Sequence, residues 1–237
     1  MIKLVDVLKS YKGKTILNNI SAEFLDEEIS VIVGANGSGK TTLCEIISGL
    51  RMPDSGRVYI NEIENCSDEF KVDFFYMPAD FYLPEYMTGN EYAEFVLSRY
   101  PQSDKVYFEQ ILHLLDMKDH IEKVIESYSF GMKKKLQILI ALSTNANTVL
   151  ADEMFSGLDF ETTAIVHELV SVSSSITKFV IVAHELDTLQ KFSNDVWVLR
   201  TGKMVRHVGN PMDLIDEICC EGEIKKRVQN IARDKSR

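Results

Sequence analysis

The sequence predicts an α/β domain that carries an inserted helical block. Apolar runs of strand length occur on both sides of the chain's middle, for example at 29–33 and 179–183. The stretch from about 90 to 143 instead spaces its apolar residues as helices do. Beyond it, strand-like and helix-like segments alternate, which is typical of a sheet covered by helices.

The first sixty residues are expected to form mainly strands and turns. The run 2–11 partly alternates between apolar and polar residues, and 16–34 contains two strand-like runs separated by the polar sequence LDEE. Residues 51–62 predict a turn and a short strand, because they begin with turn-forming Pro, Asp and Gly residues. Between these segments, 39–50 has apolar residues on one helix face and a glycine near its end.

The middle and the end of the chain follow the same reasoning. Helices are expected in the block at 90–100, 104–117 and 129–143, and strand-like runs resume afterwards. The later segments are strand-like runs at 148–152, 178–184 and 195–205, a helix at 160–175, and a charged tail at 223–237 that is either a helix or a frayed end.

Composition excludes several classes of protein. The chain has 237 residues, of which 45% are hydrophobic, so a packed core is expected. A net charge of -10 argues against a surface that follows a nucleic-acid backbone. No apolar run reaches the length of a membrane span, and the N-terminus lacks the apolar segment of a signal peptide. Four cysteines without a CxxC pair make zinc improbable, and we interpret them as reduced thiols.

The sequence GANGSGKT at 34–41 follows an apolar run and opens a predicted helix. It fits the G-x-x-x-x-G-K-[ST] pattern, in which glycines let backbone N–H groups curl around phosphates at a helix N-terminus. Lys40 is expected to reach the outer phosphates, and the Thr41 hydroxyl to ligate Mg²⁺. A glycine-rich turn without a ligand is the competing interpretation. The predicted triphosphate-binding residues are Gly34, Ala35, Asn36, Gly37, Ser38, Gly39, Lys40, Thr41 and Thr42.

Two acids end the apolar run at 148–152. Ligands of parallel sheets bind at the C-terminal ends of the strands, so Asp152 is expected to hold Mg²⁺ directly or through water. Glu153, one residue further along, is a candidate general base for an attacking water. An acidic strand end exposed to solvent is the alternative.

At this point the residues resemble the ATPase subunit of an ABC transporter over about 1–208. The motifs occur in the family's order: an aromatic at Tyr11, Walker A at 34–42, a signature sequence YSFGM at 128–132, Walker B ending at Glu153, a D-loop SGLD at 156–159, and a histidine in the switch position, His184. The resemblance implies a P-loop NTPase with a RecA-like mixed sheet, an N-terminal antiparallel β subdomain and an inserted α-helical subdomain. It implies a single domain over 1–237, with a core at 1–78 and 144–208, a helical signature subdomain at 79–143 and a helical tail at 209–237.

The resemblance also implies a mechanism with two chains paired head to tail. Tyr11 would stack on adenine unless it is simply a core aromatic at a strand end. His184 would hold the γ-phosphate and the attacking water unless it is an ordinary strand-end histidine. The partner chain would contribute the signature residues to each ATP site, with the Ser129 hydroxyl and the Gly131 N–H contacting the γ-phosphate. The implied signature and D-loop residues are Ser129, Phe130, Gly131, Met132, Ser156 and Asp159.

The chain departs from the family pattern in two places. In the signature, Tyr128, Phe130 and Met132 replace the usual residues, and the ending GMK is similar to exporters of the bacitracin-resistance and ABC-2 types. After Pro78, the family's glutamine is replaced by Ala79, which cannot ligate Mg²⁺. Asp80 could substitute for it, although a third carboxylate near Asp152 and Glu153 would add like-charge repulsion.

An aromatic cluster follows this departure. In the family the same region receives the membrane subunit, and clustered apolar residues on a subunit surface often mark a partner site. The alternative is that these residues pack onto the helical block. The predicted docking residues are Phe81, Tyr82, Leu83 and Tyr86.

These features predict an ATP-hydrolysing subunit at the cytoplasmic face of a bacterial membrane. It would use ATP and Mg²⁺, pair with a second ATPase subunit, and power a separate membrane-spanning permease that exports antimicrobial or other amphipathic peptides or lipids. No nucleic-acid partner is expected. The alternatives are a non-transport ABC ATPase acting on ribosomes or DNA, and a non-hydrolysing subunit that only Ala79 supports. Lys133–Lys135 are expected to be solvated, and the tail to be solvated or to touch anionic lipid headgroups.

Overall fold

The computed structural model describes residues 1–25, 29–183, 186–210 and 213–214. The strands are β1 (Ile2–Tyr11), β2 (Lys14–Phe24), β3 (Ser30–Val33), β4 (Ser55–Ile60), β5 (Ile63–Glu64), β6 (Phe74–Met77), β7 (Thr148–Asp152), β8 (Lys178–Val182), β9 (Asp195–Arg200) and β10 (Lys203–Arg206). The α-helices are α1 (Lys40–Ile47), α2 (Gly89–Leu97), α3 (Lys105–Leu114), α4 (Phe130–Ser143), α5 (Phe160–Ser173) and α6 (Leu186–Lys191). Within the described ranges, no helix combines the length and the apolar character needed to cross a bilayer.

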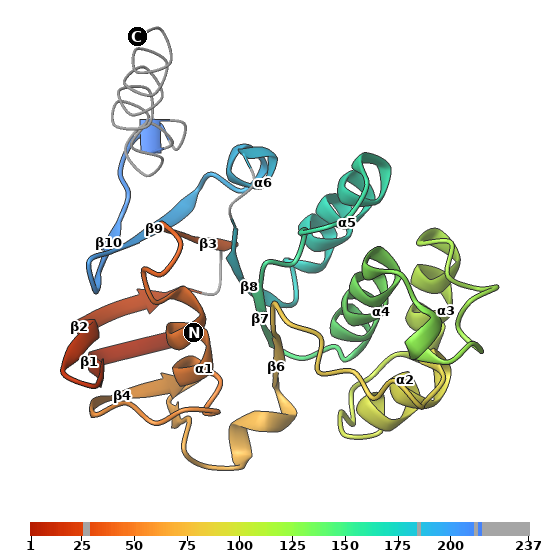
Figure 1. Cartoon of the computed structure of the whole chain (residues 1–237), viewed down its shortest axis with the longest axis horizontal. Coiled ribbons are helices and arrows are strands. Elements are labelled where there is room, and N and C mark those ends of the chain that lie inside the picture. Colours follow the sequence, from red (N-terminus) through yellow and green to blue (C-terminus); the bar gives the residue numbers. More distant parts are fainter. Residues whose placement is uncertain (26–28, 184–185, 211–212, 215–237) are drawn as a thin grey trace, which may run out of the picture.

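The strands form two sheets. An antiparallel sheet has the order β2-β1-β4-β5, and a larger sheet has the order β10-β9-β3-β8-β7-β6. In the larger sheet all neighbours are parallel except β10, which runs antiparallel to β9. Figure 1 shows the antiparallel sheet and α1 on one side of the larger sheet, with α2 to α5 on the other. This is the mixed α/β architecture with an antiparallel N-terminal part that the sequence predicts.

The central strands divide their side chains between two cores. On β3, Val31 and Val33 join the core formed with the helical side, whereas Ile32 joins the core beneath the antiparallel sheet and α1. The same alternation holds on β8, where Ile181 faces the helices and Val180 faces the other side. Successive strand residues point to opposite faces, so a strand covered on both sides must be apolar throughout.

Side chains fix where four of the helices begin. The hydroxyl of Thr88 and the carboxylate of Asp104 accept N–H groups of the first turns of α2 and α3. Ser129 and Asp159 do the same for α4 and α5. Each cap satisfies N–H groups that have no partner within the helix. By contrast, α1 begins after Gly39 without a side-chain cap and without an acidic residue in its first turn.

The run at 195–205 differs from its expected form. It is a hairpin of β9 and β10, and Thr201 and Gly202 form the turn, both with positive φ angles of 49° and 75°. A pattern of apolar residues alone does not reveal such a reversal when the turn is only two residues long.

A buried polar cluster lies where the parallel strands begin. Ser30, Lys178 and Asp195 are the first residues of β3, β8 and β9. The Lys178 ammonium donates to Ser30 Oγ at 2.8 Å, and the Ser30 hydroxyl donates to Asp195. Trp197 Nε1 and Arg206 Nε donate to the other oxygen of Asp195, at 3.1 Å and 2.7 Å. Buried polar groups of this kind are tolerated when they are hydrogen-bonded. The cluster therefore holds the N-terminal ends of these three strands together.

The expectation that the three lysines of α4 are solvated is wrong for Lys134, whereas Lys133 and Lys135 are partly exposed. The Lys134 side chain is fully buried, with its ammonium group 5.3 Å from the centre of the Phe81 ring. Lys133 forms an ion pair with Glu85 at 2.9 Å, and Lys135 donates to the Leu115 carbonyl at 3.0 Å. Consecutive helix residues point about 100° apart. Because both α2 and α3 pack against α4, the middle lysine of the run faces inward.

Candidate nucleotide-binding site

The loop between β3 and α1 can adopt its shape because of its glycines. Gly39 has a φ angle of 104°, which L-residues with a side chain rarely adopt. Gly34 lies so close to β9 that a Cβ atom would stand 2.4 Å from the Leu199 carbonyl oxygen. Because no side chain caps α1, the N–H groups of its first turn are available to an anion, which the helix dipole also favours.

Lys40 is buried at the start of α1. Its ammonium group donates to the carbonyl oxygens of Gly34 and Ala35, at 2.8 Å and 3.1 Å. Burial lowers the pKa of Lys40, while Asp152 and Glu153 oppose that shift. The loop backbone and the two carboxylates therefore hold a positive charge inside the loop, where phosphates would be bound.

Thr41 and Asp152 form the predicted metal-binding pair. The Thr41 hydroxyl donates to Asp152 Oδ2 at 2.9 Å, which joins the first turn of α1 to the end of β7. The residues that the structure describes contain no cluster of three or more His, Cys, Asp or Glu suited to a metal. Two hard oxygen ligands nevertheless fit Mg²⁺, which usually takes one or two protein ligands and completes its shell with waters and substrate phosphates.

Glu153 has an unusual backbone conformation. Its φ angle is 54°, and its N–H donates to the Val182 carbonyl of the neighbouring strand at 3.0 Å. A residue other than glycine is strained when its backbone φ angle is positive, and such residues often occur at functional sites. This conformation directs the Glu153 side chain to the same cavity as Asp152.

A cavity of about 540 Å³ joins these groups. It extends from the phosphate loop to Tyr11, whose side chain is 37% exposed at the end of β1, so Tyr11 is not a buried core aromatic. Ile16 on β2 also lines the cavity, although its sequence context gave no sign of this. The lining residues are Tyr11, Ile16, Asn36, Gly37, Gly39, Lys40, Thr41, Thr42, Asp152 and Glu153.

Some predicted residues lie elsewhere. Gly34, Ala35 and Ser38 belong to the loop but do not line the cavity. Asp80 is exposed and does not line it either. His184 lies outside the described residues.

The signature turn is not part of this cavity. Ser129 caps α4 by accepting the Met132 N–H at 3.2 Å, and Gly131 is the second residue of the helix. The Phe130 ring, which is 54% exposed, lies directly against Gly157 of the D-loop, where a Cβ atom would stand 2.2 Å from it. Tyr128, which replaces the family's leucine, is buried and donates to the His120 carbonyl at 2.8 Å. The signature turn and the D-loop of one chain are therefore in contact.

The D-loop connects Walker B to α5. The Ser156 N–H donates to the Glu153 carbonyl at 3.3 Å. Asp159 accepts both the N–H and the hydroxyl of Thr162, at 2.8 Å and 2.9 Å. These hydrogen bonds lower the pKa of the Asp159 carboxyl below its usual value.

The four predicted docking residues differ in exposure. Tyr82 and Tyr86 are 76% and 85% exposed. Leu83 is only 9% exposed, and the Phe81 ring packs edge-on against Phe130 at 4.8 Å between centroids. The expectation that all four lie on the surface is wrong for Leu83, because it joins the core of the helical side.

Comparison with known proteins shows the family. A family model described as ABC transporter matches residues 17–156. The ABC transporter ATP-binding protein YtrB of Bacillus subtilis is 26% identical over 221 residues, which cover 92% of this chain and 73% of that protein. The choline transport ATP-binding protein OpuBA of Bacillus subtilis is 28% identical, covering 91% of this chain and 59% of that protein.

A third relative is much longer than this chain. ATP-binding cassette sub-family A member 13 of Homo sapiens is 28% identical over 90% of this chain, which corresponds to only 4% of the human protein. The chain thus spans 4% to 73% of the length of these three relatives.

Solved structures share the fold. An ATP-binding subunit of an ABC transporter superposes with a TM-score of 0.81 at 21% identity and covers 92% of both chains. A dimeric ATP-binding cassette in a post-hydrolysis state, bound to ADP and Pi, superposes with a TM-score of 0.78 at 24% identity, covering 88% of this chain and all of that one. The predicted fold class is confirmed by these likenesses. The chain therefore belongs to the ABC transporter family.

Proposed function

We propose that this chain binds ATP with Mg²⁺ in the cavity described above and hydrolyses it to drive a separate membrane-spanning permease. One observation carries the ATP site: Lys40, Thr41, Asp152 and Glu153 converge on a single cavity at the C-terminal edge of the parallel strands. Ligands of open α/β sheets bind at this edge.

Each group has a distinct task in the proposed reaction. The N–H groups at the start of α1 and the Lys40 ammonium hold the phosphates, and the Tyr11 ring stacks on the base. Thr41 and Asp152 hold Mg²⁺, which neutralises phosphate charge when it is bound. Glu153 accepts a proton from the attacking water, and His184 would hold the γ-phosphate and that water.

The second half of the proposed ATP site comes from another copy of the chain. The Ser129 oxygen accepts a hydrogen bond within α4, so its hydroxyl hydrogen stays available to donate to a phosphate. Ser129 is exposed and none of the residues at 129–132 lines its own chain's cavity. Head-to-tail pairing of two chains would join each cavity to the partner's signature turn, and solved relatives of this fold are described as dimeric.

The permease would bind at the loop that carries Tyr82 and Tyr86, because both aromatic side chains are largely exposed.

Export of amphipathic peptides or lipids is supported by the similarity of the signature ending to exporter subunits. On this proposal the chain lies peripherally at the cytoplasmic face of a membrane and binds no nucleic acid. Asp80 receives no role, since its side chain does not reach the cavity lining.

Substitution of Glu153 tests the proposed chemistry. We expect Glu153→Gln to lower the ATPase rate roughly 10²–10⁴-fold, the usual contribution of a general base, while ATP binding persists. Glu161→Gln on α5 is the matched control, because Glu161 is exposed and does not line the cavity. An unchanged turnover rate in Glu153→Gln, measured by phosphate release, would show that another group activates the water.

A further inference from the structure

We propose that Arg51 is a positioning residue that holds the Tyr11 ring in the orientation needed to stack on the nucleotide base. This inference rests on the proposed role of Tyr11. It adds a residue that follows the helix of the phosphate loop and that belongs to none of the nucleotide-binding motifs.

Two cations lie against the Tyr11 ring. The Arg51 guanidinium carbon is 5.5 Å from the ring centre, and the Lys9 ammonium nitrogen is 5.7 Å from it. Tyr11 lines the nucleotide cavity, but neither Arg51 nor Lys9 does. The cations therefore approach the ring from outside the cavity, while the ring itself still lines it.

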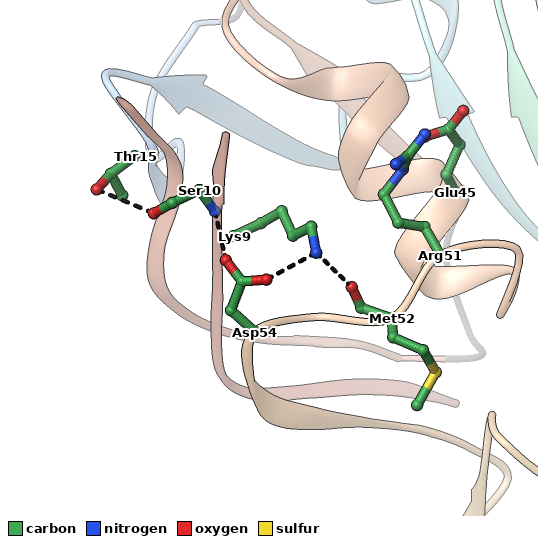
Figure 2. Close-up of polar contacts among 7 residues, drawn as sticks. All are labelled: Lys9, Ser10, Thr15, Glu45, Arg51, Met52 and Asp54. Carbon is green, nitrogen blue, oxygen red and sulfur yellow. Dashed lines mark hydrogen bonds and ion pairs between the residues drawn. The ribbon is translucent and has the colours of Figure 1, made fainter. Parts of the chain in front are cut away.

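Arg51 is itself held by the helix that opens at the phosphate loop. Its Nε donates to Glu45 Oε2 at 2.6 Å, and its backbone N–H donates to the Glu45 carbonyl at 3.0 Å. Figure 2 shows Arg51 reaching back along the end of α1 to Glu45. Because α1 carries Lys40 and Thr41 at its other end, this pair fixes the Tyr11 ring relative to the phosphate-binding groups.

Lys9 is held by a second anchor. Its ammonium group donates to Asp54 at 2.7 Å and to the Met52 carbonyl at 2.9 Å. The other oxygen of Asp54 accepts the N–H of Ser10, the residue before Tyr11, at 2.7 Å (Figure 2). The turn before β4 thus fixes the backbone of β1 next to Tyr11, and Arg51 fixes the side chain.

Holding the Tyr11 ring in place should strengthen ATP binding, because Tyr11 is partly exposed at the end of a strand. An exposed ring samples several rotamers, and binding that requires one of them is weakened by the cost of ordering it. A cation that already contacts the ring lowers this cost. An exposed cation–π contact corresponds to about 2–5-fold in a binding constant.

The experiment compares two ligands that share their phosphates. Dissociation constants of ATP and inorganic tripolyphosphate, both with Mg²⁺, are measured by calorimetry on the full chain. The variants are Arg51→Ala, Tyr11→Ala and the double variant. Arg57→Ala is the matched control, because Arg57 is an exposed arginine on β4 that pairs with Glu64 at 3.8 Å, away from Tyr11.

We expect Arg51→Ala to weaken ATP binding about 2–5-fold and to leave tripolyphosphate binding unchanged. Tyr11→Ala should weaken ATP binding more strongly, again without affecting tripolyphosphate. The double variant should bind ATP as Tyr11→Ala does, because Arg51 acts only through the ring. Arg57→Ala should bind both ligands as the unsubstituted chain does.

The results that would overturn the inference are distinct. If Arg51→Ala weakens both ligands equally, or adds its full effect to that of Tyr11→Ala, Arg51 acts on the phosphates or the fold and not through Tyr11. If only Tyr11→Ala weakens ATP binding, Tyr11 stacks on the base as proposed, but Arg51 does not position it. If Tyr11→Ala leaves ATP binding unchanged, neither base stacking by Tyr11 nor its positioning by Arg51 contributes to binding. Should Arg51→Ala not fold, Glu45→Gln, which weakens the Arg51 anchor, must produce the same selective loss for ATP.

Discussion

At the scale of single residues, Lys133 and Lys134 differ although they are neighbours in the sequence. Lys133 extends to Glu85 in an ion pair that is partly exposed. Lys134 is fully buried, and its ammonium group lies over the Phe81 ring. A long aliphatic stem fills space in the same way as an apolar side chain, so its truncation removes packing as well as charge.

This difference gives a prediction for stability. Lys134→Ala should lower the free energy of unfolding by about 2 kcal/mol or more, because it opens a cavity in a packed core. Lys133→Ala should cost less than about 1 kcal/mol, the usual value of a surface ion pair. Urea denaturation of both variants measures the two values. Equal losses would contradict the burial of Lys134.

Two glycines of the phosphate loop give a second prediction. A Cβ atom on Gly34 would stand 2.4 Å from a backbone oxygen, whereas one on Gly37 would meet no atom within 4 Å. Gly37→Ala should therefore cost only the strain of its φ angle of 78°, about 1–2 kcal/mol. Gly34→Ala must displace the loop from β9 and should cause the greater loss of both stability and ATP affinity. Denaturation and ATP titration of the two variants check this order.

At the scale of elements, prediction from the sequence succeeded where ligand binding dictates the spacing of the residues in a motif. The phosphate loop and the two acids at the end of β7 could be placed because strands and a helix directly flank them. Ile16 lines the cavity and Arg51 lies against Tyr11. Neither could be found in this way, because the packing of the antiparallel sheet and the end of α1 brings them there. Leu83 was misplaced because exposure in a loop depends on which neighbouring helices cover it. The hairpin at 195–206 was not anticipated because its turn is short. The proposed subdomain boundaries at 78 and 143 stay predictions.

The cap of α5 predicts a dependence of stability on pH. Hydrogen bonds from Thr162 lower the pKa of Asp159 in the folded state below its usual value of 3.8. The ionised cap therefore adds stability above this usual value, and that stability is lost as pH falls through the folded-state pKa. Asp159→Asn keeps an acceptor oxygen but has no charge to titrate. The stability difference between the two chains should be larger at pH 7 than at pH 3 in urea denaturation, and an equal difference would exclude this contribution.

At the scale of the whole molecule, the two halves of the proposed ATP site lie apart on one chain. The cavity is built by β1, β2, the phosphate loop, α1 and β7, whereas the signature turn lies against the D-loop at the start of α4. Because Ser129 and Gly131 do not line the cavity of their own chain, we expect them to contact phosphates bound by a partner chain. Closed pairs of chains with two-fold symmetry would form two identical composite sites.

This arrangement can be tested by mixing inactive chains. Lys40→Ala and Gly131→Asp should each be inactive alone, because each breaks both sites of a symmetric pair. An equal mixture should recover about a quarter of the full ATPase rate, since half of the pairs are mixed and each mixed pair has one intact site. Phosphate release during titration of one variant into the other measures the recovery. A mixture with no activity would argue against sites shared between chains.

The proposed permease contact is a second prediction at this scale. Tyr82→Ala combined with Tyr86→Ala should reduce co-purification with the membrane subunit, while ATP binding by the free chain stays unchanged. Ile176→Ala is a suitable control, because Ile176 is exposed to a similar degree beyond the end of α5. Normal assembly of the double variant, measured by affinity capture from detergent, would remove this loop from the interface.

The polar cluster at the start of β3, β8 and β9 has a consequence for how variation affects this protein. These strands lie in the same parallel sheet as β7 and begin at hydrogen-bonded, buried polar groups. At the opposite end of the sheet, β3 leads into the phosphate loop and β7 ends at the carboxylates of the proposed site. Substitutions at the beginnings of β3, β8 and β9, such as at Ser30 or Asp195, should reduce how much protein accumulates in a cell. Substitutions at the opposite end of the sheet, such as at Glu153 after β7, should leave abundance intact and strongly reduce turnover. In a survey of variants scored for both abundance and activity, the two classes would therefore separate between the two ends of the parallel strands.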